Sequence, residues 1–359
     1  MWYRRALKTS IIFLYLIIIA GAVVRMTGSG MGCPDWPQCF GYLIPPSHES
    51  ELQFQSNHKY EEGQVIILGE SLRVAASDFT SGVTYSETNW NTYDTHDYAA
   101  FNVWHTWIEY INRLVTALAG IPMLLMVILA FWYWKKRRWL IMGTFMVLPL
   151  MLFQAWLGKQ VVDSNLLPVK ITIHMLAALL IVAVLLWLWH QSQRKEDGDS
   201  ALTNLPADKA GAVKLHDPLF KNLMLLAVIS TLIQVAFGTQ VRQYVDERVA
   251  EIGYENKALW LEPATFMFYI HRSFSIIVTV LNMYLIYRNR KLFLGHTKLL
   301  NWILILVSLE VLTGILMYYV DFPFGTQPLH LVLASLLFGV QFYVWLESVY
   351  QIKREASLS

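Results

Sequence analysis

Three histidines fall within stretches that are otherwise apolar: His174, His271 and His330. Ionisable side chains are costly inside a bilayer, so each of them is a candidate functional residue. His271 and His330 lie near the beginnings of two expected helices, and facing histidines in a helical bundle can ligate a haem iron from both sides. The alternative for each one is an ordinary buried histidine that is hydrogen-bonded to a neighbouring helix.

The first half of the chain carries a different set of side chains. The two halves of the chain match in sequence, as described below, and Asn112 occupies the position that corresponds to His271. An amide is a poor ligand for haem iron. His105, Glu109 and Asn112 follow the spacing i, i+4, i+7, which places them on one face of a helix. With His174 as the ligand on one side only, this site would be open and would carry a carboxylate, which is compatible with an oxidation site. We interpret the second half as an electron-carrying site and the first half as an oxidising site.

Four arginines recur near these residues and are candidates for binding haem propionates: Arg25, Arg113, Arg242 and Arg272. Arginine binds carboxylates well in a partly dry setting. For Arg25 and Arg242 the alternative is an ordinary interfacial side chain whose stem lies in the membrane.

The elements that must position these residues are membrane-spanning helices. Of 359 residues, 55% are hydrophobic and 15% are charged, whereas a soluble domain has about 45–50% and about 25%. Eight apolar runs are long enough to cross roughly 30 Å of hydrocarbon. They lie near residues 9–26, 107–134, 139–157, 170–190, 219–241, 266–287, 300–320 and 328–349. The sequence therefore predicts an all-α polytopic membrane protein with eight transmembrane helices.

Lysine and arginine cluster at the chain ends and in alternate connections between the apolar runs. If each run crosses the membrane once, all of these basic clusters fall on one side. The positive-inside rule makes this side cytoplasmic, so both termini are expected there. Short basic clusters between apolar runs are a membrane pattern, and we expect no nucleic-acid partner. The long acidic loop of residues 27–103 is expected on the opposite side.

Cys33 and Cys39 are the only cysteines of the chain, and they bracket Pro-Asp-Trp-Pro-Gln. Two thiolates alone cannot form a four-cysteine zinc or iron–sulfur site. Their place in the outer loop puts them in an oxidising compartment, where a disulfide can persist. We predict a Cys33–Cys39 disulfide; whether it is only structural or takes part in a reaction is left open.

Sequence matches between the two halves indicate an internal repeat. A glycine lies sixteen residues before a histidine in both halves, at Gly158 and at Gly314, and Asn112-Arg113 matches His271-Arg272 in its context. The repeat favours a first apolar run that is a retained helix rather than a cleaved signal peptide. It predicts two tandem, pseudo-symmetric four-helix bundles joined by a cytoplasmic linker. The bundles and the linker are, in chain order, residues 1–190, 191–218 and 219–359.

The segment that begins Arg25-Met-Thr-Gly-Ser-Gly-Met-Gly-Cys33 and continues Pro-Asp-Trp-Pro-Gln-Cys39-Phe-Gly closely resembles the first outer loop of the heme A synthase family. His174, the His271-Arg272 pair and the Pro-Leu-His330 start of the last helix also match. The resemblance covers nearly the whole chain except the middle of the long loop. It implies oxidation of the C8 methyl group of haem O to the formyl group of haem A. It also implies a haem b between the second-half histidines and the substrate haem in the first half.

By the same resemblance, Glu109 matches a catalytically important glutamate, and the cysteine pair matches a pair proposed to handle haem or electrons. Many members of the family have histidine where this chain has Asn112. The substrate haem would then be ligated by His174 alone, which leaves a position for oxygen, or by His105 as a substitute second ligand. Arg113 completes the expected substrate-haem site.

The resemblance further implies a bacterial inner membrane, a substrate delivered by a haem O synthase, and an electron donor that the sequence does not identify. A homo-oligomer is left open, and we recognise no motif in residues 47–100. Two alternative functions are a dihaem, quinol-linked electron-transfer cytochrome and a non-catalytic haem carrier. A cytochrome predicts two equivalent bis-histidine sites, against which Asn112 and Glu109 argue. A carrier would not need a permanent haem in the second half.

Overall fold

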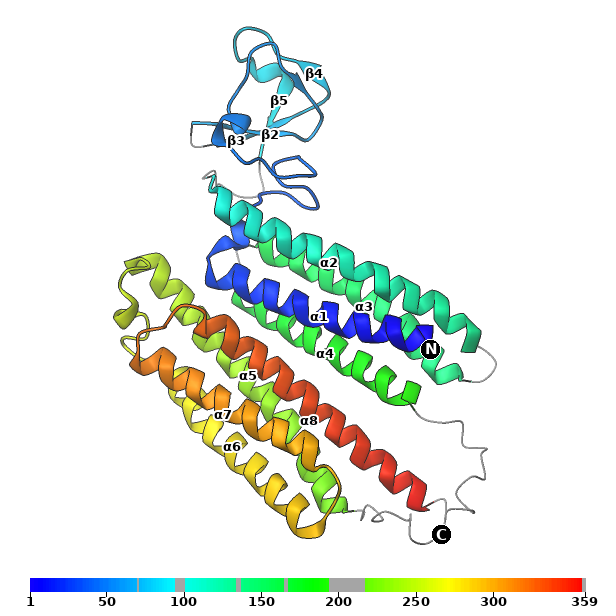
Figure 1. Ribbon diagram of the computed structural model, residues 1–359. Helices are drawn as coiled ribbons and strands as arrows, with labels where there is room; N and C mark the ends of the chain where they lie inside the picture. The colour runs from blue at the N-terminus through cyan, green and yellow to red at the C-terminus, as the bar shows by residue number, and fades with distance from the viewer. Residues whose placement is uncertain (70, 94–100, 134–136, 165–166, 194–216, 357–359) are drawn as a thin grey trace. The chain divides into compact units, whose positions relative to one another are not determined.

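The computed structural model covers residues 1–359 and describes all of them except 70, 94–100, 134–136, 165–166, 194–216 and 357–359 (Figure 1). The described residues contain eight helices that are long and apolar enough to cross a membrane. They are α1 Trp2–Met26, α2 Val103–Ala130, α3 Arg138–Asp163, α4 Pro168–Gln193, α5 Pro218–Ile252, α6 Phe266–Leu292, α7 Thr297–Tyr319 and α8 Thr326–Ala356. The prediction of an all-α polytopic membrane protein is confirmed.

Large apolar side chains cover the outside of these helices. Ile121 is 65% exposed, Leu152 is 72% exposed and Ile276 is 63% exposed. Single exposed apolar side chains are common in any protein, but their presence along every helix fits contact with lipid tails rather than with water. Each helix overlaps one of the apolar runs of the sequence.

Helix α5 extends eleven residues beyond its predicted end at residue 241. Its 35 residues correspond to about 52 Å at about 1.5 Å per residue, more than the roughly 30 Å of hydrocarbon. The additional turns carry the Arg248–Glu251 ion pair, at 2.6 Å, and mix polar residues with apolar ones such as the buried Val245. Asp217 caps the other end by accepting the N–H of Leu219 at 3.1 Å, and Pro218 occupies the first helical position.

Between α1 and α2 the chain forms a small β-structure (Figure 1). Its strands are β1 Lys59–Tyr60, β2 Val65–Leu68, β3 Ser71–Ala75, β4 Phe79–Thr80 and β5 Trp90–Thr92. Strands β1 and β4 pair in one antiparallel sheet, and β2, β3 and β5 form a second antiparallel sheet in the order β2-β3-β5. One core of this region contains Tyr60, Ile66 and Trp90, so the long acidic loop carries buried apolar side chains of its own.

The described chain forms two compact units. One contains the cysteine loop, the small β-structure and the adjoining parts of the first four helices, and the other contains α5 to α8 with the remaining parts. The unit with the cysteine loop comprises Phe13–Gly120 and Leu152–Ile171. The unit with α5 to α8 comprises Met1–Ile12, Ile121–Met151 and Thr172–Ser359. The tandem pseudo-symmetry and the halves 1–190 and 219–359 stay a prediction. Most of the predicted linker 191–218 lies outside the described residues.

Helices α5 to α8 share one apolar core, to which Phe220, Leu285, Ile303 and Leu337 each contribute a buried side chain. A buried polar chain also crosses this bundle. Thr231 on α5 donates to Gln341 on α8 at 2.7 Å, and Gln341 donates to Oδ1 of Asn282 on α6 at 3.0 Å. Because hydrogen bonds between buried polar groups are directional, this chain fixes how the three helices are rotated against one another.

Candidate functional site

His271 on α6 and His330 on α8 face each other within the second bundle. Their ring centroids are 6.3 Å apart and their planes are inclined at 72°. Two imidazoles that ligate one metal from opposite sides, with metal–nitrogen bonds of about 2 Å, have centroids roughly 6 Å apart. The observed separation therefore fits one iron ion between the two rings.

Two glycines leave room for these rings. A Cβ atom on Gly238 of α5 would lie 3.1 Å from Cε1 of His271, and one on Gly314 of α7 would lie 3.9 Å from Cε1 of His330. The first distance is tighter than ordinary van der Waals contact. A larger residue at position 238 would consequently displace the His271 ring, whereas position 314 is less demanding.

The two histidines are held differently by their surroundings. The backbone carbonyl of His271 accepts from Nε2 of Gln234 at 3.0 Å, while its ring nitrogen Nδ1 is buried without a hydrogen-bond partner among the described residues. Nδ1 of His330 lies 2.8 Å from Oγ1 of Thr313 and 3.0 Å from Oε2 of Glu310. A buried polar atom without a partner costs about 1–3 kcal/mol, so the unpartnered nitrogen of His271 fits a site built for an additional group.

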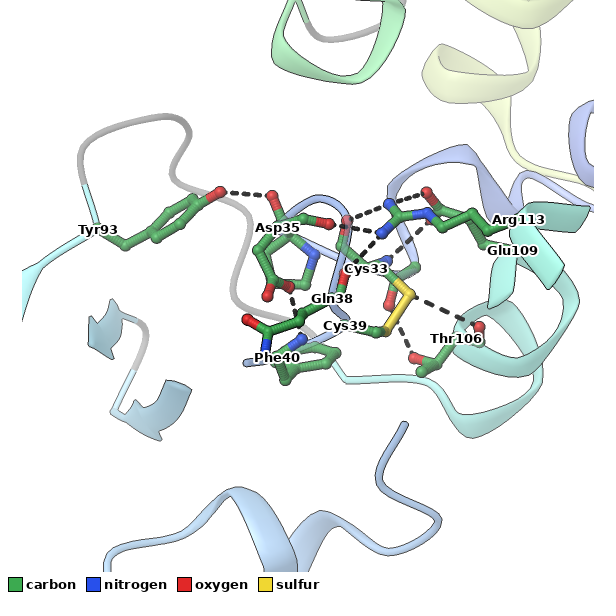
Figure 2. Close-up of polar contacts among 11 residues, drawn as sticks. Cys33, Asp35, Gln38, Cys39, Phe40, Tyr93, Thr106, Glu109 and Arg113 are labelled. Atoms are coloured by element: carbon green, nitrogen blue, oxygen red, sulfur yellow. Dashed lines mark hydrogen bonds and ion pairs between the residues drawn. A yellow bond between two sulfur atoms is a disulfide. The ribbon is translucent and has the colours of Figure 1, made fainter. Parts of the chain in front are cut away.

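In the other compact unit, the cysteine loop is closed by a disulfide between Cys33 and Cys39, with Cα atoms 4.8 Å apart (Figure 2). The predicted disulfide is confirmed. Asp35 holds the loop from inside by accepting the backbone N–H groups of Phe40 at 2.5 Å and Gly41 at 2.7 Å. Burial raises the pKa of the Asp35 carboxyl, and the two N–H groups and the Arg113 charge oppose this rise.

Glu109 and Arg113 fasten this loop to α2. Oε2 of Glu109 accepts the backbone N–H of Cys33 at 2.9 Å, and Oε1 accepts from Arg113 at 2.5 Å. Figure 2 shows the Arg113 guanidinium pointing into the loop, where it donates to the carbonyls of Asp35 at 2.6 Å and Gln38 at 2.7 Å. Since Glu109 is only 4% exposed, its carboxylate is buried and held by two donors.

A close contact between Gly32 and α2 permits this arrangement. A Cβ atom on Gly32 would lie 2.4 Å from the backbone oxygen of His105, a distance that Cβ atoms do not adopt. The hydroxyl of Thr106, which is fully buried, donates to the carbonyl of Gly32 at 2.8 Å. Glycine immediately before the first cysteine is therefore required for the loop to reach the helix.

The remaining residues predicted for the substrate site lie on α2 and α4. Oδ1 of Asn112 is buried without a hydrogen-bond partner among the described residues, and a Cβ atom on Gly21 of α1 would lie 4.0 Å from it. His105 is half-buried in the first turn of α2, where its N–H donates to Oδ1 of Asn102 at 3.3 Å. His174 is half-buried in the second turn of α4 and belongs to the other compact unit. Its pairing with the α2 residues stays a prediction.

The arginines proposed for propionates have diverse surroundings. Arg113 is engaged by the cysteine loop, as described above, and Arg242 forms an ion pair with Asp246 at 2.5 Å. The guanidinium of Arg272 lies 5.6 Å from the ring centroid of Tyr318, and Arg25 is half-buried in the last turn of α1. Their role towards propionates stays a prediction.

Two residues at the histidine pair were missed by sequence reasoning, Glu310 and Thr313. Glu310 interrupts the apolar run 300–320, and an intramembrane carboxylate is a functional candidate by the same argument that singled out the histidines. Thr313 carries no comparable signal, because threonine is common in transmembrane helices.

The eight membrane-spanning helices and the facing histidines define a multi-pass membrane protein with a site suited to haem. The sequence profile of the COX15-CtaA family, described as cytochrome oxidase assembly protein, matches residues 4–342. The chain therefore belongs to this family, which includes the heme A synthases.

Several relatives carry the name Heme A synthase. The protein of Flavobacterium johnsoniae is 20% identical over 371 residues, which is 94% of this chain and 95% of the relative. That of Ehrlichia canis is 25% identical over 354 residues, 92% of this chain and 88% of the relative. That of Shewanella oneidensis is 24% identical over 209 residues, 55% of this chain and 49% of the relative, so this match spans about half of each protein.

Proposed function

We propose that this protein is a heme A synthase, a membrane oxidoreductase that converts the C8 methyl group of haem O into the formyl group of haem A. The observation that carries the proposal is the pair of facing histidines, 6.3 Å apart, in a chain of the heme A synthase family. The relatives that cover most of both chains carry the same name, which supports the assignment.

His271 and His330 are proposed to hold a haem b by its iron. Two protein nitrogens are sufficient, because the porphyrin supplies the remaining ligands. Haem b, when bound, supplies one-electron transfer to the oxidation site. Gly238 leaves space for one ring, and the contacts of Glu310 and Thr313 fix the other.

Glu109 is proposed as the catalytic residue of the first half. Its carboxylate is buried and is oriented by Cys33 and Arg113, so it can hold a proton or a polar substrate group at a fixed place. The buried amide oxygen of Asn112 supports a ligand contact one turn along the same helix. His174, with His105 as the alternative, is proposed to ligate the iron of the substrate haem, and Arg113 to contribute positive charge.

Haem O is proposed to arrive from a haem O synthase, and electrons from a donor that is not identified. Both termini are proposed to lie in the cytoplasm, which the distribution of lysine and arginine supports. The cysteine loop would then lie on the outer side, next to Glu109.

The test is the haem content of the purified full-length protein from a host that supplies haem O. Wild-type protein should contain haem b together with haem A or haem O, and Glu109→Gln should retain haem b but accumulate haem O or a hydroxylated product. Haem b alone in both proteins would favour an electron-transfer cytochrome. A Glu109→Gln variant that makes haem A at the wild-type rate would remove Glu109 from the mechanism.

A further inference from the structure

The carboxylate of Glu310 makes a direct contact with the histidine pair. Glu310 on α7 places Oε2 3.0 Å from Nδ1 of His330 on α8. The same nitrogen lies 2.8 Å from Oγ1 of Thr313, one turn further along α7. One ring nitrogen of His330 is thus surrounded by two oxygen atoms from a single neighbouring helix.

Thr313 can donate its single hydroxyl hydrogen within its own helix. Its Oγ1 lies 2.9 Å from the carbonyl of Leu309 and 3.0 Å from that of Glu310, and both carbonyls can only accept. When this hydrogen is donated to the backbone, which is usual for threonine in a helix, Oγ1 is left to accept from His330. An iron bound at Nε2 requires the proton of the neutral imidazole on Nδ1, where Oγ1 of Thr313 and Oε2 of Glu310 are placed to accept it. Nε2 is then left with its lone pair, the form in which imidazole ligates a metal.

The carboxyl group of Glu310 has few other contacts. Its second oxygen, Oε1, is buried without a hydrogen-bond partner among the described residues. The contact with His330 is consequently the principal interaction of this carboxyl group among the described residues.

We propose that Glu310 is a positioning residue that fixes the proton of His330 on Nδ1 and thereby lowers the reduction potential of the iron bound at Nε2. This inference rests on the proposed haem b site. A carboxylate that accepts from Nδ1–H raises the basicity of the ligating nitrogen, which stabilises the more positive, oxidised iron. The site is thereby a stronger electron donor than two histidines alone would provide.

The first half lacks the corresponding carboxyl and hydroxyl groups in its sequence. Glu310 and Thr313 stand twenty and seventeen residues before His330, and Gln154 and Leu157 stand at the same separations before His174. An amide and an apolar side chain replace the carboxylate and the hydroxyl. The two halves are thus predicted to give their histidines different basicity, as an electron-donating and an electron-accepting site require.

The experiment is a redox titration of full-length, haem-loaded protein in detergent, followed by the haem b absorbance. Glu310→Gln places in the second half the side chain that the first half has. Loss of such a hydrogen-bond partner to a metal-bound histidine typically costs about 10- to 100-fold in metal affinity or activity, and we take the lower end for the reduction equilibrium. We expect the equilibrium constant for reduction to rise by about tenfold, which is about 59 mV for one electron.

Glu347→Gln is the matched control. Oε2 of Glu347 lies 3.0 Å from Nδ1 of His296, so this variant breaks a similar carboxylate–imidazole contact in the same unit. Glu347 is seventeen residues from His330 along α8, a distance of about 25 Å at about 1.5 Å per residue. Its replacement should leave the potential unchanged.

An unchanged potential in haem-loaded Glu310→Gln would overturn the proposal. If that variant retains no haem, Glu310→Asp, which keeps a carboxylate but withdraws it from His330, must show an upward shift. Loss of haem in both variants, with normal loading of Glu347→Gln, would assign Glu310 to folding and also overturn the proposal. The titration needs no turnover, so a protein that loads haem but never makes haem A would contradict the proposed function and not this inference.

Discussion

Cys33 and Glu109, which are 76 residues apart in the chain, are joined by a hydrogen bond of 2.9 Å from the backbone N–H of Cys33 to Oε2 of Glu109. The other carboxylate oxygen accepts from Arg113. One buried carboxylate thus contacts both the disulfide loop and the charge that holds this loop. A displacement of the loop would directly alter the group to which we assign catalysis.

Arg113→Gln should release the cysteine loop from α2. The substitution leaves Glu109 buried without its counter-charge, and breaking a buried ion pair in this way costs about 3–5 kcal/mol. The loop should then be reduced faster by a water-soluble thiol, measured as the rate at which the two cysteines become alkylated. Arg248→Gln, which breaks an ion pair with the exposed Glu251, should leave this rate unchanged. Equal rates in the wild-type protein and both variants would contradict the proposal that Arg113 holds the cysteine loop on α2.

The disulfide should be present in the isolated protein without added oxidant. Alkylation without reduction should fail at Cys33 and Cys39, and should succeed at both after reduction under denaturing conditions. With a sequence separation of six residues, the bond should stabilise the loop by about 2 kcal/mol through chain entropy. Cys33→Ser, Cys39→Ser and the double variant should lose similar stability, because each lacks the same bond. A double variant that is much less stable than either single one would indicate separate roles for the two residues.

Gly238→Ala should disturb the histidine pair. The added Cβ would lie 3.1 Å from Cε1 of His271, so the ring must move by a few tenths of an ångström. We expect reduced haem b content or a shifted absorbance band. Gly120→Ala, whose Cβ would meet no atom within 4 Å, is the control for an added helical methyl group. Normal haem b in Gly238→Ala would place the iron away from His271.

Asn112→His should change the substrate site rather than the haem b site. The new imidazole would replace a half-buried amide whose oxygen is buried and has no partner among the described residues. We expect bound haem O to become more nearly bis-histidine, seen as a low-spin absorbance spectrum, with slower formation of haem A. Asn301→His, at an exposed position of α7, is the control. A spectrum identical to that of wild-type protein would remove Asn112 from the substrate site.

The beginning of α5 should lose stability in acid. Oδ2 of Asp217 accepts from Nε of Arg288 at 2.5 Å, and this hydrogen bond lowers the pKa of Asp217 below its ordinary value. A carboxylate with a lowered pKa in the folded state contributes stability that is present above the unfolded pKa and is lost as the pH falls through the folded pKa. Hydrogen exchange at the start of α5 should therefore accelerate below about pH 4. Asp217→Asn should be less protected at neutral pH and should lack this pH dependence.

The eight helices could be predicted from the sequence because each contains a run of about twenty mostly apolar residues, the length that crosses a bilayer. The last turns of α5 escaped prediction because Gln243 and Glu247, for example, carry no apolar signal. The small β-structure escaped because its strands have two to five residues, and Val65–Leu68 is uniformly apolar rather than alternating.

The candidate site was predictable by residue type but not by contact. His271, His330 and the cysteine pair stand out because of their chemistry and their place in the chain. The hydrogen bond between Cys33 and Glu109 joins residues 76 positions apart, and no local sequence pattern predicts such a contact. Glu310 could have been singled out as a carboxyl group within an apolar run. Only the contact with His330 shows which residue it acts on.

The ion pair on α2 also bears on how this helix enters the membrane. Glu109 and Arg113 are one turn apart on the same helix, with the two charged groups 2.5 Å from each other. Helix α2 therefore carries its own counter-ion and does not depend on the cysteine loop to neutralise the carboxylate. During biosynthesis the segment can partition into lipid as an internally neutral unit. The loop can dock afterwards, once its disulfide has formed.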